Sequence, residues 1–198
     1  MLRRYLKIFS LMTLAVPLAL QADVENMREH EATSIVSVSR VNYPTPQVAL
    51  VRSDGRSVAL SQELDDGRPV VMNFIFTTCE TTCPLSSATF SALERQLRSD
   101  PHKVHIVSIS IDPEQDTPPR LRAYAKRFSA GPDWQFYTGT VAASLAAQQA
   151  FNAYRGDKMS HTPLTLMRAA PGRPWLRIEG FATPDQLLQQ YHELLADL

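Results

Sequence analysis

An α/β fold, with a central mixed β-sheet flanked by helices, is the class that this sequence predicts, and three observations predict it. Two apolar runs rich in β-branched residues, 70–76 and 104–111, are typical of strands covered on both faces. A segment with helical periodicity follows each run. The chain then finishes in a hairpin and an amphipathic helix. Strands that alternate with helices in this way favour a three-layer domain.

The elements before the first apolar run are less regular. Residues 23–45 have a weak hydrophobic period, which predicts a flexible lead-in with a short strand at 34–38. An N-terminal hairpin follows over 47–60, with Ser53-Asp54-Gly55 as its turn. The domain is therefore expected to span residues 46–198.

The later elements have clear start and stop signals. Pro84 suits the first turn of a helix, and Thr117-Pro118-Pro119 begins another helix that Gly131-Pro132 ends. The remaining pattern predicts strands at 134–137, 162–167 and 175–179, an alanine-rich helix at 141–154, and a closing helix at 184–198 capped by Thr183.

Cys79 and Cys83 are the only cysteines, and they lie on the turn between the first buried strand and its helix. Backbone N–H groups and the positive end of a helix dipole favour a thiolate over a thiol at such a turn. A disulfide that closes so short a loop constrains the unfolded chain little, so a structural bridge explains the pair poorly. The pair indicates redox or metal chemistry. A cysteine turn after the first central strand also makes a thioredoxin-like sheet the best single prediction.

His161 is the candidate third member of the site. In a thioredoxin-like sheet the strand that follows it lies beside the cysteine-bearing strand, so the imidazole can face Cys79 and Cys83. Two thiolates and one imidazole form a soft donor set suited to Cu(I), whereas a closed zinc site usually has a fourth protein ligand. Pro163 leaves a question open, because a cis-proline facing the cysteines would favour redox exchange and the sequence does not define the isomer.

The segment from Asp112 to Pro118 lies at the exit of the second buried strand, the edge where α/β sheets place their sites. Ordinary architecture is the commoner explanation for such a segment: Asp112 completes the turn, and Asp116 or Thr117 caps the next helix. Both interpretations stay open at this point.

Other polar groups have no comparable setting. The remaining histidines are expected at the surface or at edges; they are His30, His102, His105 and His192. A basic run most simply coats a solvated helix face, with docking of an acidic partner as the alternative; it comprises Arg120, Arg122, Lys126 and Arg127.

Charge and the N-terminus bear on location. Lysine plus arginine equals aspartate plus glutamate at 20 each, so no net charge favours nucleic acid as a partner. Residues 1–7 are basic and residues 8–20 are almost uncharged and apolar, which predicts a signal peptide or a short membrane anchor over 1–22. Cleavage after Ala22 and retention as an anchor are both open. We expect a periplasmic protein, either exported or held at the outer face of the inner membrane.

Three motifs together resemble the Sco/SenC family of copper proteins. They are Cys79-x-x-x-Cys83-Pro84, Asp112-Pro113-x-x-Asp116-Thr117-Pro118, and His161 ahead of a late strand. The resemblance implies a thioredoxin-like fold from about Pro46 onwards and copper, as Cu(I) or Cu(II), bound by Cys79, Cys83 and His161. The chain departs from the common family pattern at Glu80-Thr81, where Pro-Asp is frequent, and at Ser160, where Asp is frequent.

The resemblance also implies a function. A copper metallochaperone would act in assembly of the dinuclear copper site of cytochrome c oxidase or of a similar cuproenzyme, with that copper-site subunit and a thiol reductant protein as partners. The alternative is a thiol-disulfide oxidoreductase that reduces the partner's copper-site cysteines, with Cys79 as the attacking thiol and Cys83 as the resolving one. An exported structural domain with an incidental bridge is a third hypothesis.

Overall fold

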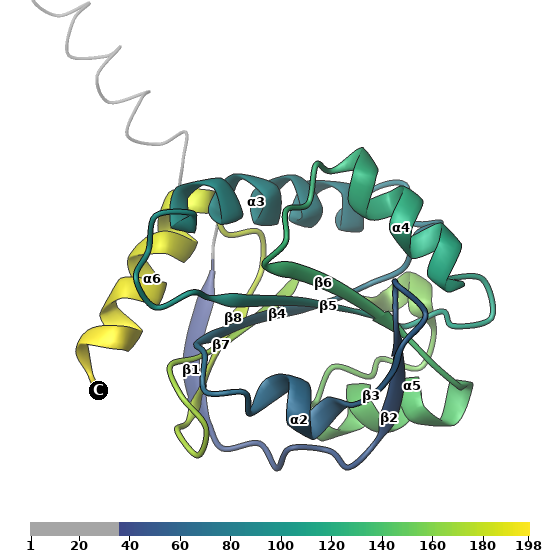
Figure 1. The fold of residues 1–198 in the computed structure, drawn as a ribbon, viewed down its shortest axis with the longest axis horizontal. Helices are drawn as coiled ribbons and strands as arrows, with labels where there is room; N and C mark the ends of the chain where they lie inside the picture. Colours follow the sequence, from purple (N-terminus) through teal and green to yellow (C-terminus); the bar gives the residue numbers. More distant parts are fainter. Residues whose placement is uncertain (1–35) are drawn as a thin grey trace, which may run out of the picture. The chain divides into compact units, whose positions relative to one another are not determined.

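The structure is a computed structural model that describes residues 36–198. The predictions for residues 1–22, His30 and most of the lead-in lie outside the described residues. Within them, one eight-stranded sheet has the order β1-β8-β7-β4-β5-β6-β2-β3 (Figure 1). Among residues 36–198, no helix is long and apolar enough to cross a membrane.

The strands alternate with helices, as the sequence predicts. The strands are β1 Ser37–Val41, β2 Ala49–Arg52, β3 Ser57–Ala59, β4 Val70–Ile75, β5 His105–Ser110, β6 Trp134–Thr138, β7 Leu164–Arg168 and β8 Trp175–Glu179. The helices are α2 Leu60–Leu64, α3 Thr82–Leu97, α4 Pro118–Arg127, α5 Val141–Ala150 and α6 Pro184–Ala196, with a 3₁₀ turn, η1, at Lys158–Ser160. Strand β5 is parallel to β4 and β6, and the other pairs are antiparallel, so the sheet is mixed.

Helices cover both faces of the sheet. Figure 1 shows α3, α4 and α6 on one face and α2 and α5 on the other. Phe90, Tyr124 and Tyr191 pack in the core of the first face, and Leu60 and Phe151 pack in that of the second. Every residue of β4 and β5 is buried, because both strands lie in the middle of this sheet. The predicted thioredoxin-like α/β fold is confirmed.

The structure corrects several element boundaries. The early strand lies at 37–41 rather than 34–38, and it pairs with β8 as an edge strand whose residues are mostly exposed, which explains its weak period. Helix α2 has no predicted counterpart, since five residues with two buried leucines show little periodicity. Helix α3 begins two residues before Pro84. The N-terminal hairpin and the Thr183 cap of α6 are confirmed.

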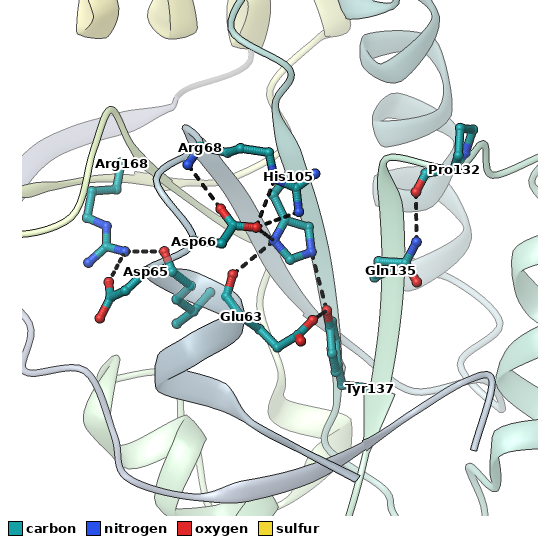
Figure 2. A network of polar contacts seen from close by, with 10 residues as sticks. Glu63, Asp65, Asp66, Arg68, His105, Pro132, Gln135, Tyr137 and Arg168 are labelled. Atoms are coloured by element: carbon teal, nitrogen blue, oxygen red, sulfur yellow. Dashed lines mark hydrogen bonds and ion pairs between the residues drawn. The ribbon is translucent and has the colours of Figure 1, made fainter. Parts of the chain in front are cut away.

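His105 is a further correction, because it is only 1 % exposed rather than at the surface. Its Nδ1–H donates to the carbonyl of Glu63 at 3.0 Å and lies 3.5 Å from the Asp66 carboxylate. Its Nε2 is 3.2 Å from the hydroxyl of Tyr137, which donates to the Glu63 carboxylate. Figure 2 shows this network between α2, β5 and β6, with Arg68 paired to Asp66. Burial lowers the pKa of His105, so the ring is neutral near pH 7.

We expect the free energy of unfolding to fall as the pH drops below about 6.5, the ordinary pKa of histidine. In that window the unfolded chain protonates His105, whereas the folded protein resists it because burial disfavours the charge. The unfolded state then binds more protons, so stability rises with pH. The charge of Arg68 acts with burial to lower the pKa of His105, whereas Asp66 and Glu63 oppose the shift without cancelling it.

Urea unfolding of the wild type and of His105→Gln at about pH 7.5 and about pH 5.5 measures this effect. The variant should lose less stability between the two conditions than the wild type. His102→Gln changes an exposed ring and is the matched control. If the free energy of unfolding depended on pH equally in the wild type and in His105→Gln, His105 would not be the group responsible.

Candidate metal centre

The two cysteines lie where β4 leaves the sheet. The chain turns after Ile75, Cys79 is in the turn, and Cys83 is the second residue of α3. The Cys79 N–H donates to the carbonyl of Phe76 at 3.2 Å, and the Cys83 N–H donates to the Cys79 sulfur at 3.3 Å. Both thiols are free and buried, with exposed fractions of 9 % and 2 %. The predicted strand-to-helix turn is therefore present, and it brings the two sulfurs to one place.

The environments of the two thiols differ. Burial raises the pKa of Cys83 to about 12. Burial also acts to raise the pKa of Cys79, but hydrogen bonds from the N–H groups of Cys83, Thr81 and Thr82 outweigh it and lower this pKa below its ordinary value. The turn thus favours the thiolate at Cys79 and the thiol at Cys83.

Asp116 ties the cysteine turn to the neighbouring strand. Its carboxylate is fully buried and accepts from the N–H and hydroxyl of Thr77 and from the hydroxyl of Ser110, at 3.1, 2.5 and 2.6 Å. Thr117 occupies the N-cap position of helix α4, as one of the two interpretations has it, but its side chain makes no cap hydrogen bond, and Asp116 is not the cap. The carboxylate instead satisfies the N–H of Thr77, which has just left the sheet. Asp116 therefore joins the exits of β4 and β5.

His161 lies beside the same strand end. Its Nε2 is 3.1 Å from the carbonyl oxygen of Phe74, which can only accept, so Nε2 carries the proton and Nδ1 keeps its lone pair. Metal-binding histidines are commonly held in this manner by a carbonyl on the other ring nitrogen. Burial lowers the pKa of His161, with a smaller contribution from the charge of Arg155, which favours the neutral ring.

The three predicted ligands share one edge of the sheet but are not preassembled. Across residues 36–198, no three His, Cys, Asp or Glu side chains lie close enough to hold a metal ion. The peptide bond before Pro163 is trans, since the described residues include no cis bond, and so gives no support to redox exchange. His102 and His192 are exposed as predicted, as is the basic run of α4.

Lys158 is a residue of this edge that the sequence did not single out. It opens η1, and its ammonium donates to the Asp112 carboxylate at 2.6 Å. A cleft of about 610 Å³ adjoins this pair and His161, and Tyr154 and Arg155 also line it. The pair joins positions 46 residues apart, so no local pattern indicates it.

A thioredoxin-like sheet with two free thiols at a strand-to-helix turn, and an imidazole at the end of the same strand, defines the class of thiol-dependent redox and metal-binding proteins. The sequence profile of the SCO1/SenC family matches residues 45–196. The chain belongs to this family.

Individual relatives agree with this assignment. The chain is 36 % identical over 100 residues to a SCO1 protein homolog of Bacillus subtilis, covering 50 % of this chain and 51 % of that protein, so it spans about half the length of this curated relative. ScoI of Bradyrhizobium japonicum, solved with copper bound, is 25 % identical with a TM-score of 0.64, over 78 % of this chain and 100 % of that one. BsSco, described as a cytochrome c oxidase assembly protein with a disulfide switch, is also 25 % identical, with a TM-score of 0.66 over 80 % and 96 % of the two chains.

Proposed function

We propose that this protein is a copper metallochaperone that binds Cu(I) through the thiolates of Cys79 and Cys83 and the neutral imidazole of His161. The observation that carries the proposal is the pair of free, buried thiols at the exit of β4, where the backbone N–H of Cys83 donates to the Cys79 sulfur. Soft thiolates select Cu(I) over hard cations, and the neutral imidazole completes the donor set. The copper-bound ScoI structure supports this choice of metal.

The residues present fit the ion. Cys79 is the more readily ionised thiol, whereas Cys83 must release its proton when the metal binds, because only the thiolate is a ligand. His161 must approach the thiol pair, since the three side chains are not clustered among the described residues. Copper would then pass to a partner by exchange of ligands.

The receiving partner is proposed as the dinuclear copper site of cytochrome c oxidase or of a similar cuproenzyme. The description of BsSco as an oxidase assembly protein supports this partner. The protein would work on the periplasmic side, directed there or anchored by residues 1–22, and residues 46–198 would form the copper-binding domain. A thiol reductant protein would keep Cys79 and Cys83 reduced.

We expect His161→Ala to bind Cu(I) more weakly than the wild type. The size of the loss can be judged from structural zinc sites with four ligands, whose binding free energies are about 10–16 kcal/mol, or roughly 3 kcal/mol for each ligand. Loss of one ligand from the copper site should therefore weaken binding by about 100-fold. Competition of the reduced domain against a Cu(I) chelator measures the loss, and His192→Ala is the control because that ring is exposed. Wild-type affinity in His161→Ala would exclude the three-ligand site.

A second candidate function is thiol-disulfide exchange, which the unequal thiols favour. The Cys79 thiolate would attack a partner's disulfide, and the Cys83 thiol would then displace the partner. The partner would gain two thiols while Cys79 and Cys83 form a disulfide, which the thiol reductant protein would reduce again. Cys83→Ser should trap the mixed disulfide on a non-reducing gel, and failure to trap any partner would count against this function.

A further inference from the structure

The side chain of Lys158 ties the loop that carries His161 to the sheet edge. Lys158 lies three residues before His161 and donates to Asp112, whose side chain is 8 % exposed, at 2.6 Å. The same ammonium lies 5.7 Å from the centre of the Phe76 ring, within the range of a cation–π contact. Asp112 follows β5 and Phe76 follows β4, so Lys158 contacts the exits of both central strands.

The turn transmits the position of Lys158 to His161. The Met159 N–H donates to the Asp157 side chain at 2.8 Å, and the Ser160 N–H donates to the Asp157 carbonyl at 3.0 Å. The His161 N–H donates to the carbonyl of Lys158 itself at 3.2 Å. These bonds make η1 one compact unit that moves with Lys158.

The rest of the loop has little burial to hold it. Residues 154–160 are exposed throughout, and Met159 is 74 % exposed. Gly156 has φ +81°, a left-handed conformation that glycine adopts without strain. A segment with so little buried surface opens easily, so its order depends on its few side-chain contacts. These include the contacts of Lys158, the hydrogen bond from His161 to Phe74, and the ion pair of Arg155 with Glu179.

We propose that Lys158 is a positioning residue that keeps His161 at the end of β4, from where it can approach the thiol pair, by holding η1 against Asp112 and Phe76. This inference rests on the proposed function, in which His161 is a copper ligand. Without the ion pair, the loop moves away from the strand exits and the imidazole is lost from the metal site more often. Lys158 therefore sets how firmly the protein retains copper.

The metal-free protein provides the first test. In Lys158→Met, which keeps most of the aliphatic stem, we expect the amides of residues 159–161 to exchange with deuterium roughly 10-fold faster than in the wild type. Lys158→Arg keeps a charged donor and should stay near the wild-type rate. Lys126→Met removes an exposed lysine of α4 and is the control. Unchanged exchange in Lys158→Met would overturn the proposal.

Copper affinity provides the second test. Loss of a residue that orients a metal ligand typically costs about 10- to 100-fold in affinity, and we expect Lys158→Met to fall at the lower end of that range. Lys158→Met placed in a His161→Ala background should cause no further loss, because Lys158 acts through His161. An equal loss in both backgrounds, or none in the wild-type background, would overturn the positioning role. Wild-type affinity of His161→Ala alone would instead reject the proposed ligand set.

Discussion

Cys79→Ser and Cys83→Ser should each abolish stoichiometric Cu(I) binding under conditions in which the wild type is fully loaded. A serine hydroxyl is not ionised near neutral pH and is a hard donor, so each replacement removes one of two thiolates. The estimate of roughly 100-fold for each ligand is a lower limit here, since the remaining set of one thiolate and one imidazole no longer favours a soft ion. Competition against a Cu(I) chelator measures the loss.

Thr81→Ser is the matched control for both cysteine variants. Thr81 is exposed and lies between the cysteines, and the replacement keeps the N–H that stabilises the Cys79 sulfur. This variant should bind copper as the wild type does. The unfolding midpoint of each variant is measured as well. A variant that has lost only a copper ligand keeps the wild-type midpoint, whereas a variant that has lost the fold does not. Tight binding that survives both cysteine replacements would place the copper site elsewhere in the protein.

Asp116→Ala should lower the free energy of unfolding by about 3 kcal/mol, because leaving a buried donor without an acceptor costs about 1–3 kcal/mol, and less for the two donors of Thr77, which is half-buried. The donors are the N–H of Thr77 and the hydroxyls of Thr77 and Ser110. Thr77 is two residues before Cys79, so the variant should also loosen the cysteine turn and weaken copper binding in the protein that remains folded.

Urea unfolding of Asp116→Ala beside Glu114→Ala gives the comparison. Glu114 lies in the same segment but is exposed, so its removal should change stability by less than about 0.5 kcal/mol. Asp116→Asn keeps one acceptor oxygen and should fall between the two. Stability of Asp116→Ala equal to that of Glu114→Ala would mean that the carboxylate does not hold the two strand exits together.

The sequence predicts the fold well where its patterns are local. The apolar runs that became β4 and β5 are buried on both faces, and Thr183 forms the capping box expected of a helix start. The prediction fails at α2 and at the early edge strand. Both are short, and their apolar residues do not recur with a regular period, so their formation depends on the neighbouring sheet and core.

In the candidate site, too, the local features could be predicted from the sequence and the long-range contacts could not. The cysteine turn follows from residues adjacent in sequence, whereas the pairs Asp116 with Thr77 and Lys158 with Asp112 join distant segments. His105 had an available signal: it lies in a run that reads as covered on both faces, and a polar side chain buried there needs partners. Only tertiary packing identifies those partners as Glu63 and Tyr137.

The two partly or fully buried imidazoles lie near opposite ends of one central strand. His105 is paired in register with Val70, and His161 donates to the carbonyl of Phe74, so about 13 Å of β4 separates the two positions at 3.3 Å per residue. Each ring has one nitrogen bonded to a backbone carbonyl, which defines its tautomer. The protein therefore contains its own spectroscopic reference: added copper should shift the nitrogen resonances of His161, while those of His105 stay in place and report that the rest of the domain is intact.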